Sequence, residues 1–132
     1  MAIEVRWDHI NRYPVLVYEF YRGWTWKDFF DVKLRADTLL ESSSVKIPLL
    51  FDLRRTPDMP PGMLKHTRKY AVNRQLNGSP IIVIGASKVV QTTFTIVARM
   101  IAGYAEHELT DDILFVAYWE DVPDSLRRHG VS

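Results

Sequence analysis

The stretch Ile47-Pro48-Leu49-Leu50-Phe51-Asp52-Leu53 is a short apolar run that a proline-rich turn follows. A second apolar run, Ile81-Ile82-Val83-Ile84, continues directly into Gly85-Ala86-Ser87. Apolar runs that are too short for a helix and are bounded by turn residues are typical of strands covered on both faces. The two runs therefore predict two buried strands.

A helix is expected after each of these strands. Residues 61–76 begin with proline, which suits a first helical turn because the amide hydrogen that proline lacks is not needed there. Ser87 is the expected N-cap of the next helix, which should end by Gly103. Because that helix is apolar over a wide side, we expect it to be the most buried helix. Its apolar residues are Val89, Val90, Phe94, Ile96, Val97, Met100, Ile101 and Tyr104.

The chain begins with two strand patterns and a helix pattern. Residues 3–7 alternate between apolar and charged side chains, and residues 14–21 are β-branched and aromatic, so we expect an antiparallel hairpin. Thr25, with Asp28 three residues later, is a variant of the capping box and predicts a helix over residues 26–42.

The end of the chain completes the expected fold. A strand over residues 113–118 should precede a short helix that Asp121 or Asp124 caps and that reaches about His129. Strands and helices alternate after the hairpin, which implies right-handed crossovers. We therefore predict a single α/β domain over residues 1–132, with a mixed, mostly parallel sheet of about five strands, an N-terminal hairpin and four helices. The loops expected to face a ligand are residues 53–60, 85–88 and 119–121.

The composition excludes several classes of protein. The 132 residues contain no cysteine, which excludes disulfides, thiol nucleophiles and thiolate metal sites. No apolar run approaches the roughly 20 residues that span a bilayer. The first eight residues carry Glu4, Arg6 and Asp8, where a signal peptide needs an apolar core. We therefore expect a soluble, cytoplasmic protein without a transmembrane segment.

The net charge of +1 conceals a division along the chain. Residues 54–99 carry eight Lys or Arg against one acid, Asp58, whereas residues 100–126 carry seven acids and no Lys or Arg. The basic block forms either an anion-binding face or a solvated face that the acidic block partly neutralises. Nucleic acid is not an expected partner, because no recognition helix or stacking pattern appears.

Residues suited to catalysis are few. Asp52 ends a buried strand, where a carboxylate acts as a general base or else binds the following loop or an arginine. Residues 85–88 either hold an anion on their backbone N–H groups or form a plain N-capped junction. The histidines lack metal-ligand spacing and no serine hydrolase motif occurs. We expect no catalytic residue, no metal and no cofactor.

The order of elements resembles a known group. The strand ending in Asp52, the Pro60-Pro61-Gly62 entry to a helix, and the strand that leads into Gly85-Ala86-Ser87 resemble the SpoIIAA-like branch of the STAS superfamily, whose namesakes are anti-sigma-factor antagonists. The resemblance implies a mixed sheet, antiparallel at its first strand. Regulatory members open the helix after the Asp-containing strand with a phosphorylatable serine. This chain has prolines there, so the resemblance implies the fold without that phosphoacceptor.

These observations favour a non-enzymatic regulatory or binding module for a protein partner or a small anionic or lipid ligand. The expected binding residues are Arg54, Arg55, Thr56, Lys65, Arg68, Lys69, Ser87 and Lys88. The alternatives are a small enzyme that uses Asp52 and residues 85–88, and a mainly structural homo-oligomer.

Self-association is expected through the first helix. Phe29, Val32, Ala36, Leu39 and Leu40 form its apolar stripe toward the core. Trp26, Phe30 and Leu34 lie on its flank and have no obvious place in the same core, so they predict a homodimer interface. The alternative is that the strand over residues 14–21 or the C-terminal helix covers them within the monomer.

Overall fold

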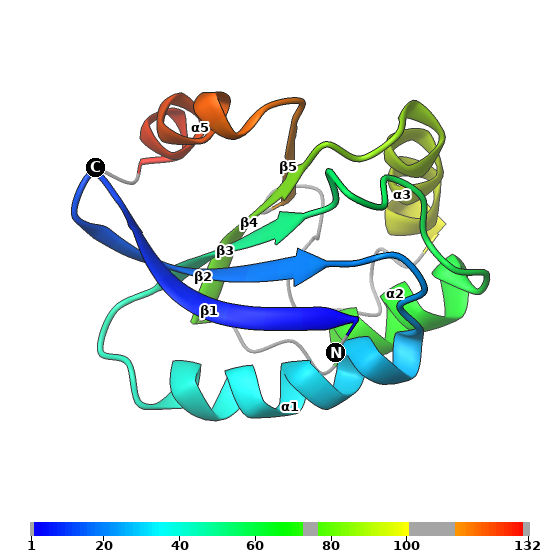
Figure 1. The fold of residues 1–132 in the computed structure, drawn as a ribbon, viewed down its shortest axis with the longest axis horizontal. Helices are drawn as coiled ribbons and strands as arrows, with labels where there is room; N and C mark the ends of the chain where they lie inside the picture. The colour runs from blue at the N-terminus through cyan, green and yellow to red at the C-terminus, as the bar shows by residue number, and fades with distance from the viewer. Residues whose placement is uncertain (1, 73–76, 101–112, 131–132) are drawn as a thin grey trace.

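The structure, a computed structural model, describes residues 2–72, 77–100 and 113–130 and contains one five-stranded sheet in the order β1-β2-β3-β4-β5 (Figure 1). The strands are β1 (Ile3–Ile10), β2 (Tyr13–Phe20), β3 (Ile47–Asp52), β4 (Gly78–Ile84) and β5 (Ile113–Val116). β1 pairs antiparallel with β2, and every later pair is parallel. The predicted mixed sheet with an N-terminal hairpin is confirmed.

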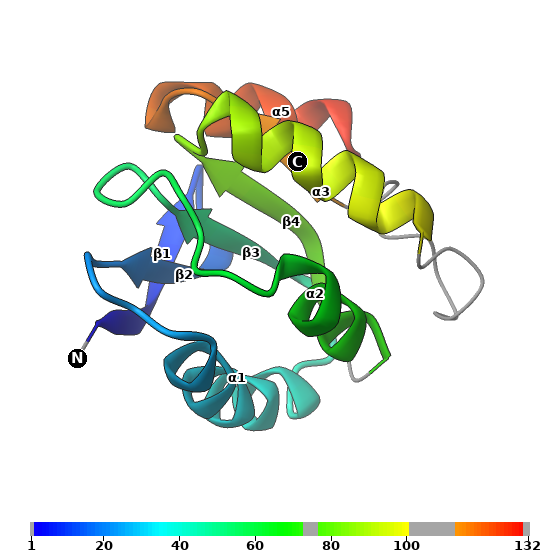
Figure 2. The ribbon, with the colours of Figure 1, turned by 90° about the vertical axis from the view of Figure 1, so that its right-hand side faces the viewer.

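Four α-helices in the described residues cover the two faces of the sheet unequally. They are α1 (Trp26–Glu41), α2 (Met63–Val72), α3 (Lys88–Met100) and α5 (Val122–Arg128), and the 3₁₀ turn η1 (Trp119–Asp121) precedes α5. α1, α2 and α3 lie on one side of the sheet, and α5 lies on the other (Figures 1 and 2).

The alternation of side chains along β2 builds both cores. Leu16 and Tyr18 point to the α1 side and join the larger core cluster. Val15 and Val17 point the other way and pack with Leu126 of α5. Because successive strand residues face opposite sides, one apolar strand supplies both layers.

The hairpin is tighter than the sequence suggested. The strand patterns over residues 3–7 and 14–21 leave residues 8–13 as the connection, but the strands extend to Ile10 and from Tyr13. Asn11 and Arg12 form the connection with φ angles of 49° and 70°. Two-residue hairpin turns with positive φ match the twist of the paired strands, and Asn accepts that conformation readily.

Capping residues set the helix starts as predicted for α1 and α3. The backbone N–H of Asp28 donates to Thr25 Oγ1 (3.1 Å), and the Thr25 N–H donates to Asp28 Oδ2 (3.0 Å), which completes a capping box. The N–H of Val90 donates to Ser87 Oγ (3.2 Å). α2 begins at Met63 rather than at residue 61.

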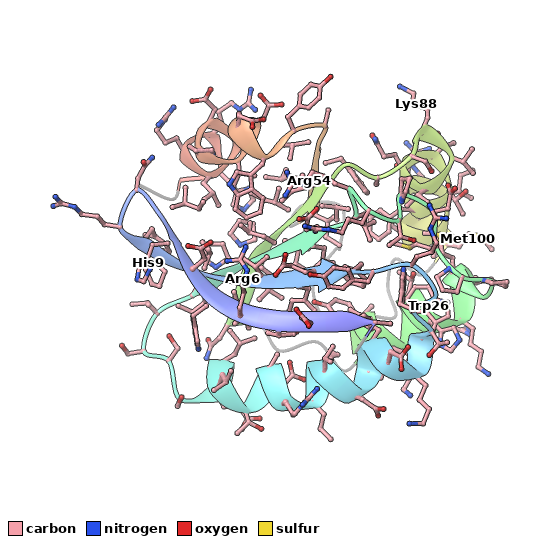
Figure 3. The ribbon with its side chains drawn as sticks, in the orientation of Figure 1. Arg6, His9, Trp26, Arg54, Lys88 and Met100 are labelled. Carbon is pink, nitrogen blue, oxygen red and sulfur yellow. The ribbon has the colours of Figure 1, made fainter. Side chains whose placement is uncertain are left out.

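Two expectations about buried helix residues are wrong. In α3, Val89 is 72% exposed, and Ile96 and Met100 are also exposed; Figure 3 shows Met100 at the outer side of that helix. The apolar residues of α3 occupy two sides of the helix, and only the side with Val90 reaches the sheet. In α1, Leu39 is 43% exposed. Ile101 and Tyr104 lie outside the described residues.

Candidate functional site

Asp52 and Arg54 form a hydrogen-bonded ion pair at the carboxyl end of β3. Asp52 is 1% exposed. Its Oδ1 accepts hydrogen bonds from the Arg54 backbone N–H (3.1 Å) and Nε (2.9 Å), and its Oδ2 accepts one from Arg54 Nη2 (2.9 Å). Burial raises the pKa of Asp52, but the hydrogen bonds and charge of Arg54, with the charge of Arg55, outweigh burial and hold that pKa below its ordinary value. A carboxylate held in this way is a weak base, so the geometry favours a structural role for Asp52.

The register of the sheet explains why two arginines follow Asp52. Glu19 of β2 lies opposite Asp52 of β3, which places two carboxylates side by side. Arg55 Nη1 lies 3.7 Å from Glu19 Oε2 and 3.8 Å from Asp52 Oδ2. Adjacent like charges on paired strands destabilise a sheet. Arg54 and Arg55 therefore neutralise charges within the fold.

The junction from β4 to α3 uses two of its four backbone donors internally. The N–H of Gly85 donates to Val116 O (2.9 Å), and the N–H of Ser87 donates to Pro57 O (3.1 Å). Ser87 Oγ serves as the N-cap of α3. Lys88 is exposed and points away from the sheet (Figure 3). This geometry favours the plain N-capped junction over an anion cradle.

The sheet separates the predicted binding residues into two groups. Arg54 lies on the α5 side, where its guanidinium is 5.4 Å from the centre of the Trp119 ring. Lys69 lies on the other side, with Nζ 4.3 Å from the centre of the Phe30 ring of α1. Lys65 and Arg68 are exposed on α2 beside Lys69, and Thr56 is half-buried in the loop after β3. The residues therefore do not form one continuous surface, and their role in binding stays a prediction.

An apolar cavity of about 60 Å³ lies between the sheet and the layer of α1, α2 and α3. It has room for roughly four to six water-sized groups, because one water needs roughly 10–15 Å³. Its ring-bearing lining residues are Phe20, Trp24, Trp26, Phe29, Phe51, His66, Tyr70, Phe94 and Phe115. The sequence reasoning missed this cavity. The aromatic residues clustered at positions 20–30 were its only signal, and they were interpreted as core or interface.

Three rings in contact form one wall of the cavity, with Trp24 edge-on to Trp26 and Trp26 stacked on His66. The ring centres of Trp24 and Trp26 are 5.1 Å apart, and those of Trp26 and His66 are 5.0 Å apart. Trp26 Nε1 donates a hydrogen bond to Pro61 O (2.8 Å), which ties the start of α1 to the loop before α2. This wall is therefore held by both helices.

Two polar atoms in that wall have no partner among the described residues. They are the indole Nε1 of Trp24 and the Nδ1 of His66, and both atoms are buried. Burial, followed by the charges of Lys65 and Lys69, holds the pKa of His66 below its ordinary value, so its imidazole is neutral at pH 7. The cavity thus combines an almost wholly apolar surface with a positive potential from α2, and the two unpartnered atoms have almost no accessible surface.

No family model and no curated protein matches this chain. The crystal structure of an uncharacterized protein from the DUF3478 family with a SpoIIAA-like fold, from Shewanella loihica PV-4, is similar with a TM-score of 0.65. The two chains are 13% identical, and the match covers 95% of this chain and 94% of the other. The fold is SpoIIAA-like.

Two further findings accompany the SpoIIAA-like fold. None of the helices that the structure describes has the length and apolar character needed to cross a membrane. Within residues 2–72, 77–100 and 113–130, no three His, Asp or Glu side chains are grouped so as to hold a metal ion.

The SpoIIAA-like fold gives the proposed interface residues different environments. Trp26 and Phe30 pack against the main core within one chain, and Figure 3 shows Trp26 between the start of α1 and α2. His66 and Lys69 of α2 cover them, rather than β2 or the C-terminal helix. Leu34 is 72% exposed. The premise that Trp26 and Phe30 lack a place in the core is wrong, and dimerisation through α1 stays a prediction.

Leu34→Glu tests self-association without disturbing the core. If α1 forms an interface, sedimentation equilibrium should show a dimer for the wild type at high micromolar concentration and a monomer for Leu34→Glu. The variant should unfold within about 0.5 kcal/mol of the wild type, because Leu34 is exposed. Phe30→Glu is unsuitable because Phe30 packs against the core. A monomeric wild type would exclude this interface.

Proposed function

We propose that the chain is a non-enzymatic binding module for a small amphipathic anion. The apolar part of the ligand occupies the cavity between the sheet and α2, and the cations of α2 attract its negative charge. The observation that carries the proposal is the almost wholly apolar lining of a cavity whose wall includes His66, next to Lys65 and Lys69.

The cavity and the cations of α2 contribute to binding in different ways. Transfer of a methylene group from water into an apolar cavity stabilises a complex by about 0.8 kcal/mol, which is about fourfold in affinity. The cations of α2 add attraction that weakens with salt. The side chain of Asp52 is bound to Arg54 on the other side of the sheet, so this proposal assigns no chemical step.

A series of straight-chain carboxylates from acetate to octanoate tests the proposal. We expect the affinity, measured by NMR titration, to rise about fourfold per methylene until the cavity is full and then to level off. Lys65→Gln with Lys69→Gln should weaken every member about three- to tenfold at low salt. The matched control, Lys27→Gln with Lys46→Gln, removes the same charge elsewhere on the surface and should leave the affinities unchanged.

Adjacent valines of α3 separate cavity binding from surface binding. Val90 lines the cavity, whereas Val89 is 72% exposed. Val90→Phe should fill the space and remove the dependence on chain length, and Val89→Phe should keep it. If the series binds the Val90→Phe variant as it binds the wild type, the ligand does not use the cavity and the proposal is wrong.

A protein partner is the second candidate. Val89, Ile96 and Met100 leave one side of α3 apolar and exposed, and Lys88 begins the same helix. An acidic partner with an apolar contact would suit that side. The two candidates differ in where they act, because a partner would require the outer side of α3 and the carboxylate series requires the cavity.

A further inference from the structure

The strand β1 leaves one edge of the sheet open. It is eight residues long and pairs only with β2 among the described strands (Figure 1). The N–H of Tyr21 donates to Ala2 O (2.7 Å), so the even-numbered residues of β1 form the hydrogen-bonded pairs with β2. The backbone N–H and C=O groups of residues 3, 5, 7 and 9 therefore point away from the sheet.

A groove of about 430 Å³ follows this edge. It is bounded by residues 3–6 of β1 and by Val32, Ala36 and Leu39 of α1. Leu39 is 43% exposed although it lines the groove. Trp7, which shares the α1 side of β1 with residues 3 and 5, is 46% exposed. Apolar side chains that one chain leaves uncovered therefore flank the open backbone.

We propose that β1 pairs antiparallel with β1 of a second copy of this chain, with Val5 opposite Val5 on a two-fold axis. The sheets of the two copies then form one continuous sheet. Addition of a strand to an open edge is a recurring mode of recognition, because it satisfies the outward N–H and C=O groups of both strands. A two-fold axis uses the same surface on both copies. This interface does not depend on the ligand that the cavity binds.

The charges of β1 exclude the register with the most overlap. With Arg6 on the axis, Arg6 would face Arg6 of the second copy, and Glu4 would face Asp8. Like charges directly opposite one another destabilise a strand pair. With Val5 on the axis, Glu4 of each copy faces Arg6 of the other. These pairs are non-hydrogen-bonded positions, where opposite side chains come closest. The charges of the edge are thus self-complementary in this register.

Glu4 also favours Val5 over Trp7 as the centre. An axis at Trp7 would place Arg6 opposite Asp8 of the second copy, but Arg6 already donates to Asp8 within its own chain (2.5 Å). Glu4 is exposed and has no ion-pair partner among the described residues of its chain. An axis at Val5 gives this carboxylate a partner. Arg6 Nη2 is available for it, because the bonds to Asp8 and Glu19 use Nη1 and Nε.

Amide hydrogen exchange of the wild type tests both the edge and the register. Sedimentation equilibrium should show a dimer at high micromolar concentration. At that concentration the N–H groups of Ile3, Val5 and Trp7 should exchange at least about tenfold more slowly than in dilute protein. The Arg6 N–H, which faces β2, should be protected at both concentrations. If His9 gains protection and Ile3 does not, the axis is at Trp7 and the proposal is wrong.

Charge reversal on β1 gives a test that misfolding cannot imitate. Glu4→Arg places arginine opposite Arg6 of the second copy, and Arg6→Glu places glutamate opposite Glu4. Each variant alone should self-associate about tenfold more weakly or less. An equimolar mixture of the two should form a heterodimer, because every reversed charge then faces an opposite one. Glu41→Arg, exposed at the end of α1, is the matched control and should dimerise as the wild type does.

Proline at position 5 separates backbone pairing from charge. Val5→Pro removes an N–H that points away from β2, and proline is tolerated at such positions of an edge strand. The variant should stay folded and monomeric, whereas Leu34→Glu, on the outer side of α1, should leave this dimer intact. A monomeric wild type, a dimer that Val5→Pro and both charge variants preserve, or a mixture of folded charge variants that stays monomeric would overturn the proposal. If Val5→Pro folds poorly, the wild-type amide exchange decides.

Discussion

Replacement of Asp52 by Asn is expected to lower the free energy of unfolding by about 1.5–3 kcal/mol at pH 7. The carboxylate accepts three hydrogen bonds from Arg54, two of them from the guanidinium. An asparagine keeps one acceptor oxygen, but its NH₂ group would face the donor Arg54 Nη2. The variant would also leave the guanidinium without its closest negative charge. Urea unfolding followed by tryptophan fluorescence measures the difference.

The stabilising effect of Asp52 should depend on pH in one direction. Its pKa in the folded protein is held below the ordinary value of 3.8. A carboxyl with a depressed folded pKa contributes its full stabilisation above its unfolded pKa and loses it as the pH falls through the folded value. The gap between wild type and Asp52→Asn should therefore be constant above about pH 5 and shrink below about pH 4.

Asp8→Asn is the matched control. Asp8 also pairs with an arginine, Arg6, at 2.5 Å, but both side chains are about 40% exposed (44% and 39%). Exposed ion pairs contribute about 0–1 kcal/mol. A loss for Asp52→Asn no larger than the loss for Asp8→Asn would show that burial adds nothing to the Asp52 pair.

The elements were predictable because each depends on a local pattern. Short segments carry each of the signals that predicted an element. These signals are the alternation in residues 3–7, the apolar runs at β3 and β4, and the Thr25 capping residue. The hairpin turn was missed because Arg12, with φ of 70°, is not a residue that signals a left-handed conformation.

The division of the basic block could not be read from charge counts. Arg54 and Lys65 are close in sequence, yet a strand end and a helix start place them on opposite sides of the sheet. The pairing of Arg55 with Glu19 depends on the register between β2 and β3, which residue counts do not give. The summed charge of a segment therefore overestimates the number of cations available to a ligand whenever some of them neutralise buried acids.

The cavity was beyond sequence reasoning for a related reason. Its lining comes from four strands and three helices, so its existence depends on how far α2 and α3 stand from the sheet. An apolar residue has the same pattern in the sequence whether it fills a core or lines a space. The unpartnered Trp24 N–H likewise depends on which carbonyl groups the folded backbone brings near it.

Gly85→Ala is the second variant with a large expected effect, because two costs coincide at this position. Gly85 has φ of +74°, a conformation that costs an L-residue about 1–2 kcal/mol. A Cβ there would lie 2.7 Å from Arg54 Cγ and 3.1 Å from Arg54 Cα. Relief of such crowding costs typically about 1–3 kcal/mol. The free energy of unfolding should fall by about 2–5 kcal/mol in urea.

Gly23→Ala separates the two costs at Gly85. Gly23 has φ of +87°, but a Cβ there would have nothing within 4 Å, so its loss should be only the conformational part, about 1–2 kcal/mol. The excess loss at Gly85 measures the contact with Arg54. Because that contact displaces the residue that holds Asp52, Gly85→Ala and Asp52→Asn should cost less together than the sum of their separate effects. Equal losses at Gly85 and Gly23, with additive effects of Gly85→Ala and Asp52→Asn, would show that Arg54 gives way freely and that β4 does not fix the Asp52 pair.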